Sequence, residues 1–83
     1  MIYESEETIT GRMRQSNEWI EYRGTLRIEE SGEPRVSLDL VFVPPHPFVL
    51  NMPTQHSIRA QSVTEAYSEL VRFLAEYGVD FDS

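Results

Sequence analysis

The feature that most constrains the fold is an alternation of apolar and polar residues, with a period of two, in two neighbouring segments. In WIEYRGTLRIE the even positions from Ile20 to Ile28 are mostly apolar, and in RVSLDLVFV the even positions from Val36 to Phe42 are apolar. Successive side chains of a strand point to opposite faces, so this pattern predicts two strands that each bury one face. The turn-forming residues EESGEP between them predict an antiparallel hairpin.

The length of that turn predicts a register. If Glu30 to Pro34 form the loop, Glu29 pairs with Arg35, and Gly24 falls opposite Leu40 in the middle of the buried face. A glycine weakens the interior of a strand unless something approaches it closely. We therefore interpret Gly24 as the place where a helix crosses the sheet, or as a β-bulge.

On the other face of the hairpin, the same register places an acidic residue among basic ones. Asp39 comes opposite Thr25 and diagonal to Arg23 and Arg27, within reach of both. A carboxylate between two guanidinium groups resembles a binding site. A structural ion pair between strands is the favoured interpretation.

A single amphipathic helix is predicted near the C-terminal end of the chain, over about residues 62–77. Ser62 and Glu65 form a capping box that can satisfy free backbone N–H groups at its start, and Gly78 can adopt the left-handed conformation that ends a helix, with Val79 folding back on Leu74. The apolar residues at helical spacing are Val63, Ala66, Tyr67, Leu70, Val71, Leu74 and Tyr77.

Two further segments complete the predicted fold. Residues 54–60 have strand character, and the N-terminal segment alternates Ile9, Gly11 and Met13 with polar residues, with QSNE as a hairpin turn. The predicted fold class is α+β: a small two-layer sandwich in which an antiparallel sheet of three to four strands is covered on one face by the C-terminal helix. A helix, three strands and a helix is the alternative. Residues 1–83 are too few for two cores, so one domain is expected.

Composition restricts the classes of function. Fourteen acidic residues stand against seven arginines, with no lysine, which gives a net charge of −7 that repels nucleic-acid phosphates and anionic lipids. The absence of cysteine excludes disulfides, thiolate catalysis and thiolate metal sites. No apolar run is long enough to span a membrane, and MIYESEET lacks the features of a signal peptide. We therefore expect a cytoplasmic protein that binds no membrane.

The sequence predicts neither catalysis nor a cofactor. A nucleophilic site would need His46 or His56 beside a serine or threonine, and neither histidine lies in a recognisable motif. The spacing of histidine and acidic residues matches no metal-binding motif, and no glycine-rich phosphate loop occurs. We expect a protein that is not an enzyme and holds no metal.

The leading hypothesis is a small acidic protein-interaction module, because one helix can cover only one face of the sheet. Such a module would bind itself or another protein through the open face and the proline-rich segment VFVPPHPFVL. That segment is interpreted either as a hinge, in which the Trp19 indole packs on two proline rings, or as an exposed apolar patch. The candidate partner-binding residues are Trp19, Arg23, Arg27, Val41, Val43, Pro44, Pro45 and His46.

Two alternatives involve nucleic acid. Trp19, Arg23 and Arg27 share one strand face, where an aromatic ring and two guanidinium groups could bind a single strand. The acidic surface could instead imitate nucleic acid and occupy a protein that binds it. The net charge argues against the first alternative, and no specific motif supports the second.

Overall fold

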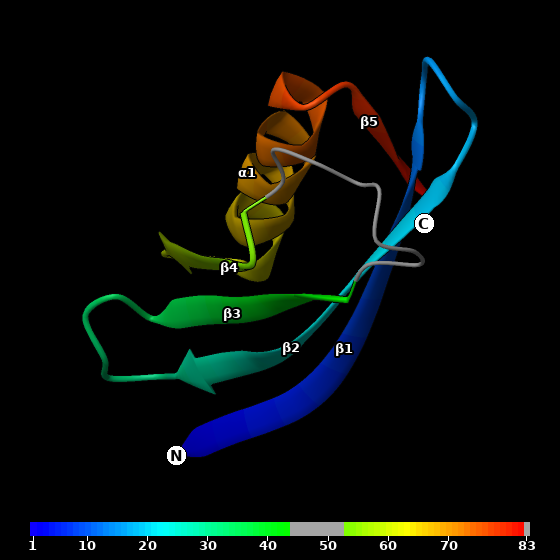
Figure 1. Ribbon diagram of the computed structural model, residues 1–83. Coiled ribbons are helices and arrows are strands. Elements are labelled where there is room, and N and C mark those ends of the chain that lie inside the picture. The colour runs from blue at the N-terminus through cyan, green and yellow to red at the C-terminus, as the bar shows by residue number, and fades with distance from the viewer. Residues whose placement is uncertain (44–52, 83) are drawn as a thin grey trace.

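The computed structural model describes residues 1–43 and 53–82, in which five antiparallel strands and one helix occur (Figure 1). The strand order across the sheet is β4-β3-β2-β1-β5. The elements in chain order are β1 (Ile2–Met13), β2 (Trp19–Glu29), β3 (Val36–Val43), β4 (Gln55–Ala60), α1 (Val63–Glu76) and β5 (Val79–Asp82).

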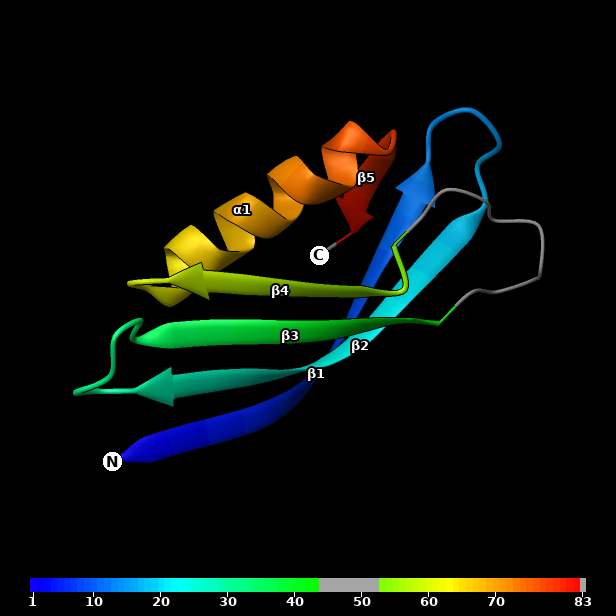
Figure 2. The same ribbon diagram turned by 60° about the vertical axis from the view of Figure 1, so that its left-hand side comes forward.

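The sheet is curved into a half-barrel, and α1 closes its concave side. The first four strands are sequential neighbours, and α1 then carries the chain to the far edge, where β5 pairs with the end of β1. Figures 1 and 2 both show α1 lying between β4 and β5. In the described part of the chain, no helix is long and apolar enough to cross a membrane.

The face of the sheet that α1 covers, here called the inner face, holds the core. Even positions of β2, β3 and β4 point to it, together with odd positions of β1. The predicted hairpin register is confirmed: Glu29 N–H donates to the Arg35 carbonyl oxygen at 2.7 Å, and Leu26 pairs with Leu38. The most completely buried large side chains are Ile20, Tyr22, Leu38, Leu40, Leu70, Leu74 and Val79.

The predicted helix and its ends are confirmed. The Ser62 hydroxyl accepts from the backbone N–H of Glu65 at 3.1 Å, and the Glu65 carboxylate accepts from the backbone N–H of Gln61 at 3.3 Å. Gly78, with φ +71°, adopts the left-handed conformation expected after the helix. Its N–H donates to the Ala75 carbonyl oxygen at 3.0 Å, so α1 ends where its sequence predicts.

The predicted N-terminal strand and the strand near 54–60 are also present, as β1 and β4. Ile9 and Gly11 are buried on the inner face, and Asn17 takes a positive φ of 59° in the turn that joins β1 to β2. The alternative with an N-terminal helix is wrong. The reason is the pairing along almost the whole of β2, which holds β1 extended from Ile2 to Arg12.

Two predictions need correction. Among the described residues the sheet has five strands and not three to four, because Val79, which is buried in the same core cluster as Leu74, begins a fifth strand and pairs with Met13. Gly24 marks neither a helix crossing nor a β-bulge, since β2 pairs with β1 and β3 without a break in register there. A Cβ atom at Gly24 would meet the Asp39 carbonyl oxygen and, at 2.9 Å, the Leu40 side chain, both on β3. The close approach is therefore made by the neighbouring strand.

Candidate functional site

The face of the sheet opposite α1, here called the outer face, is the candidate site. Even positions of β1 and odd positions of β2, β3 and β4 point to it. Among the predicted partner-binding residues, five lie on the outer face: Trp19, Arg23, Arg27, Val41 and Val43. The other three, Pro44, Pro45 and His46, lie outside the described residues.

Strand pairing arranges the outer-face side chains in rows across the sheet. Arg23 lies between Thr8 of β1 and Val41 of β3. In the next row, Thr25 lies between Glu6 and Asp39. Because opposite residues in an antiparallel pair lie side by side, charges from three strands become neighbours. The hairpin sequence alone could predict only the β2 and β3 members of each row.

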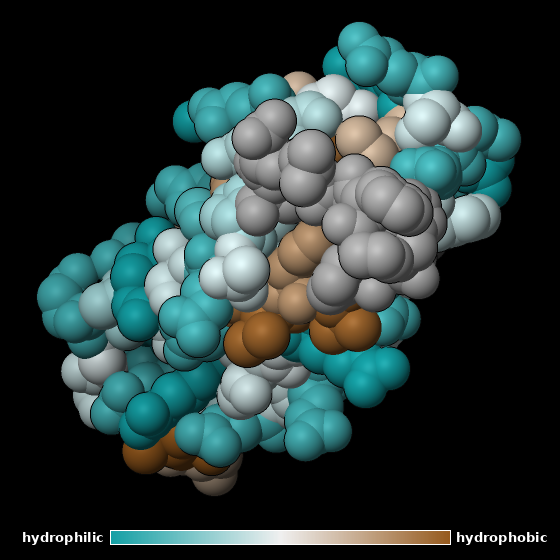
Figure 3. All heavy atoms as spheres, viewed as in Figure 1, coloured by the Kyte–Doolittle hydropathy of each residue, from teal (hydrophilic) through white to brown (hydrophobic). Residues whose placement is uncertain are grey.

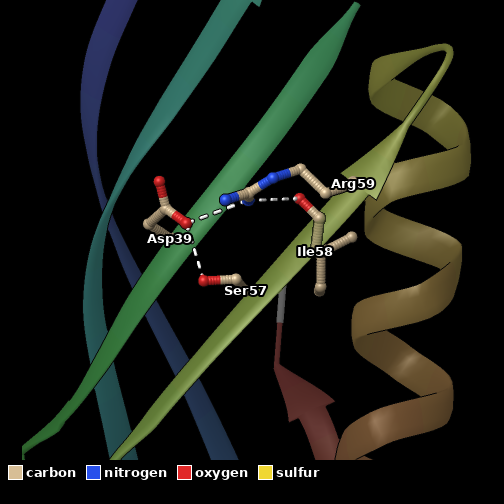
Figure 4. A network of polar contacts seen from close by, with 4 residues as sticks. All are labelled: Asp39, Ser57, Ile58 and Arg59. Atoms are coloured by element: carbon tan, nitrogen blue, oxygen red, sulfur yellow. Dashed lines mark hydrogen bonds and ion pairs between the residues drawn. The ribbon is translucent and has the colours of Figure 1, made fainter. Parts of the chain in front are cut away.

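Asp39 forms the best-defined polar cluster on the outer face (Figure 4). The Ser57 hydroxyl donates to Asp39 Oδ1 at 2.8 Å, and Arg59 Nη1 donates to the same oxygen at 3.0 Å. The Ser57 hydrogen bond, assisted by Arg59, lowers the pKa of the Asp39 carboxyl. The expected ion pair exists, but its partner was predicted wrongly, because Arg59 on β4 takes the place expected for Arg23 or Arg27.

Arg23 and Arg27 pair with other carboxylates. Arg23 Nε lies 3.3 Å from Glu21 Oε2, and Arg27 Nε lies 3.7 Å from Glu4 Oε1. The guanidinium groups of both arginines are largely in solvent, so each pair contributes little to stability. Charges of both signs therefore lie side by side on the outer face.

Trp19 has a partner that the sequence did not identify. Its side chain is 44% exposed, and the guanidinium carbon of Arg12 lies 4.2 Å from the centroid of the indole ring. This is cation–π geometry, which arises because Arg12 on β1 is the register partner of Trp19 on β2. No signal in the sequence linked the two residues, because the register between β1 and β2 was not predicted.

A shallow hollow of about 520 Å³ lies where β2 passes Gly24. It has a single apolar side chain, Val41, which is 52% exposed. Figure 3 shows apolar atoms between hydrophilic ones in the middle of the face that is viewed. The residues that line the hollow are Glu6, Glu7, Thr8, Arg23, Gly24, Thr25, Asp39 and Val41. The hollow is open to solvent and lined mostly by polar and charged side chains.

Titratable side chains elsewhere have structural contacts. The His56 ring stacks on Phe73 of α1, with centroids 3.8 Å apart. The Tyr22 hydroxyl donates to the Pro53 carbonyl oxygen at 3.2 Å, and burial, followed by the charge of Tyr77, raises the pKa of Tyr22 to about 12. Among residues 1–43 and 53–82, no group of three or more histidine or acidic side chains could hold a metal ion.

The outer face has to be interpreted from its own chemistry. No protein-family model matches the chain, and neither the curated proteins nor the solved structures give a match.

Proposed function

We propose that this protein is a non-catalytic interaction module that binds another protein through its outer face. The observation that carries the proposal is the exposed Val41 in a hollow surrounded by charged and hydroxyl side chains. An apolar centre with a polar rim is the common anatomy of protein interfaces.

The arginine pairing favours a protein partner over nucleic acid. Arg23, Arg27 and Arg59 each lie within 4.0 Å of a carboxylate oxygen. A phosphate backbone would meet these carboxylates as well as the guanidinium groups, and the net charge of −7 would repel it at long range. Paired charges of both signs instead match the mixed polar rim of another protein, where they provide specificity.

A second copy of the chain is the alternative occupant. Two copies repel each other through their net charge of −7, which favours a different protein. Light scattering coupled to gel filtration at micromolar concentration decides between the two. We expect a monomer near 10 kDa. A dimer that dissociates in the Val41→Asp variant would instead mean that a second copy of the chain occupies the outer face.

Photo-crosslinking from the outer face tests the proposal in the native cell. A photoreactive amino acid at Val41 should give a discrete adduct, and one at Val71, which is 45% exposed on α1, should not. Adding purified protein should compete the adduct away, and purified Arg23→Glu or Val41→Asp protein should compete much less well, because either change disrupts the hollow. Equal competition by both variants, with unchanged folding, would contradict the proposal.

A further inference from the structure

Half of β1 forms an open edge of the sheet. β5 pairs with β1 only from Thr10 to Met13, whereas β2 pairs with β1 from Ile2 to Arg12. In Figures 1 and 2 no described strand lies beside the N-terminal half of β1 on the side away from β2. Residues 2–8, here called the free edge, therefore have a strand partner on one side only among the residues that the structure describes.

The pattern of backbone hydrogen bonds shows which groups the free edge offers. The bond from Glu29 N–H to the Arg35 carbonyl means that odd residues of β2 bond to β3. The N–H and C=O groups of even residues of β2 then bond to β1, where their register partners are odd residues. The odd residues of β1 therefore direct their N–H and C=O groups toward β2. The even residues of β1 point the other way. Thr10 and Arg12 meet β5 in this manner. Within residues 1–43 and 53–82, no strand pairs with the N–H and C=O groups of Ile2, Glu4, Glu6 and Thr8 that point away from β2.

We propose that the free edge binds an extended segment of a partner protein as an added antiparallel strand. β5 already pairs with this edge at Thr10 and Arg12, so the backbone there has the geometry that strand addition requires. The four main-chain positions of the free edge would give affinity, and the side chains on either side of it would give specificity. The free edge offers main-chain groups, whereas the hollow offers side chains, and Glu6 and Thr8 belong to both. The inference does not depend on the proposed function of the outer face.

Charge indicates which side chains of the added segment fit on the side of the outer face. Glu4 and Glu6 both point to that side and are exposed. Arg27 lies 3.7 Å from Glu4, whereas no arginine among the described residues lies within ion-pairing distance of Glu6. An added strand places every second side chain beside these carboxylates, so arginine or lysine fits there.

Apolar surface identifies the side chains that point inward. Tyr3 is 57% exposed on the inner side of the free edge. Further along that side, the centroid of the Tyr67 ring of α1 lies 6.3 Å from that of Phe81. Burial, followed by the charge of Glu7, raises the pKa of Tyr67. Ser5 and Glu7, the other inner-side residues of the free edge, are polar and half-buried, with the Ser5 hydroxyl donating to Glu7 Oε1 at 2.8 Å. The segment therefore carries basic residues on the side of the outer face and an apolar residue beside Tyr3.

A second copy of the free edge does not fit this site. Antiparallel pairing of two copies has to join even residues to even residues, because only those groups point outward. The registers that use most of the edge then place Glu4 opposite Glu6, or one of the two opposite its own counterpart. Like charges directly opposite each other are destabilising, and such charges protect natural sheet edges from self-association. The same glutamates attract a basic strand.

Hydrogen exchange with a defined peptide tests the inference. The probe is a synthetic peptide of alternating arginine and valine, as long as the free edge, at physiological salt so that general attraction is screened. We expect protection of the amides of Glu4, Glu6 and Thr8, which exchange quickly without peptide, and no change at Ser5 and Glu7. A peptide with glutamate in place of arginine should bind at least about tenfold more weakly, because like charges then meet. A peptide with its arginines and valines in two blocks should protect these amides less.

A proline variant separates strand addition from charge attraction. Glu6→Pro removes an N–H that points away from β2, so the β1–β2 ladder stays intact, and such positions on edge strands tolerate proline. Glu6→Gln is the matched control, since it removes the same charge and keeps the N–H. We expect Glu6→Gln to weaken peptide binding a few-fold and Glu6→Pro to abolish the protection.

The outcomes are distinct. Equal binding by both variants, equal binding of the arginine and glutamate peptides, or a lack of protection in the folded wild-type protein would each overturn the inference. Protection that grows with protein concentration without peptide would also overturn it, by making a second copy the occupant. Val41→Asp, two strands away from the free edge, should leave peptide binding unchanged, and Glu4→Pro, at a free-edge position outside the hollow, should abolish the protection and leave the crosslink from Val41 unchanged. Failure of one proposal is thereby separated from failure of the other.

Discussion

The inner and outer faces are built from the same strands, residue by residue, and differ in almost every property. Leu40 and Val41 are adjacent on β3, and yet Leu40 is 2% exposed beneath α1 while Val41 is 52% exposed. The inner face is closed by one helix and contains no buried polar or charged side chain among the described residues. The outer face carries exposed charges in rows. The alternation of a strand thus separates residues that stabilise the fold from residues that stay exposed to solvent.

The largest expected effect tests this separation on two adjacent residues. Leu40→Ala should lower the free energy of unfolding by about 2–5 kcal/mol, because it leaves a cavity under α1. Val41→Ala should change it by no more than about 0.5 kcal/mol, because its side chain is largely in solvent. Denaturant melts monitored by circular dichroism measure both changes. A similar loss for the two variants would mean that Val41 is covered in the folded protein.

The pH dependence of stability tests the inner face through Tyr22. Its pKa is about 12 in the folded protein and about 10 in the unfolded chain, since burial disfavours the phenolate. A raised pKa favours the neutral form, so this stabilisation is complete below pH 10 and is lost as the pH rises toward 12, by about 2 kcal/mol. Melts between pH 9 and about 12 measure the loss.

Tyr22→Phe is the control for that experiment. It removes the titrating group and the hydrogen bond to Pro53, so stability near neutral pH should fall while the dependence above pH 10 becomes shallower. A part of the dependence should stay, because burial and Glu7 also raise the pKa of Tyr67. An equally steep dependence in Tyr22→Phe would contradict the assignment to Tyr22.

The predictable part of the fold follows from local patterns. The register of β2 and β3 depends on one short loop, and the bond between Glu29 and Arg35 forms as the loop length predicts. The ends of α1 depend on Ser62 and Gly78, whose preferences act within one turn. β5 was missed because four residues with two apolar side chains carry almost no periodic signal. Its partner strand is also more than sixty residues away.

The candidate site was predictable only where it depends on the hairpin. Trp19, Arg23 and Val41 were placed on the correct face because the alternation of β2 and β3 determines their direction. The partners Arg12 and Arg59 come from β1 and β4, and pairing across those strands is a tertiary property. The sequence of the hairpin alone does not determine whether Arg59 or Arg27 pairs with Asp39.

The smallest expected effect concerns Trp19. The size of the loss on its truncation distinguishes an exposed tryptophan from a buried one. Exposed cation–π pairs contribute about 0.5–1 kcal/mol, so Trp19→Ala and Arg12→Ala should each lower the free energy of unfolding by about that amount. The double variant should lose less than the sum of the two, because both remove the same contact. Melts at several protein concentrations keep dissociation of any complex from being counted as unfolding. A loss of about 3 kcal/mol or more for Trp19→Ala alone would contradict the exposed position, because truncation of a core tryptophan has that magnitude.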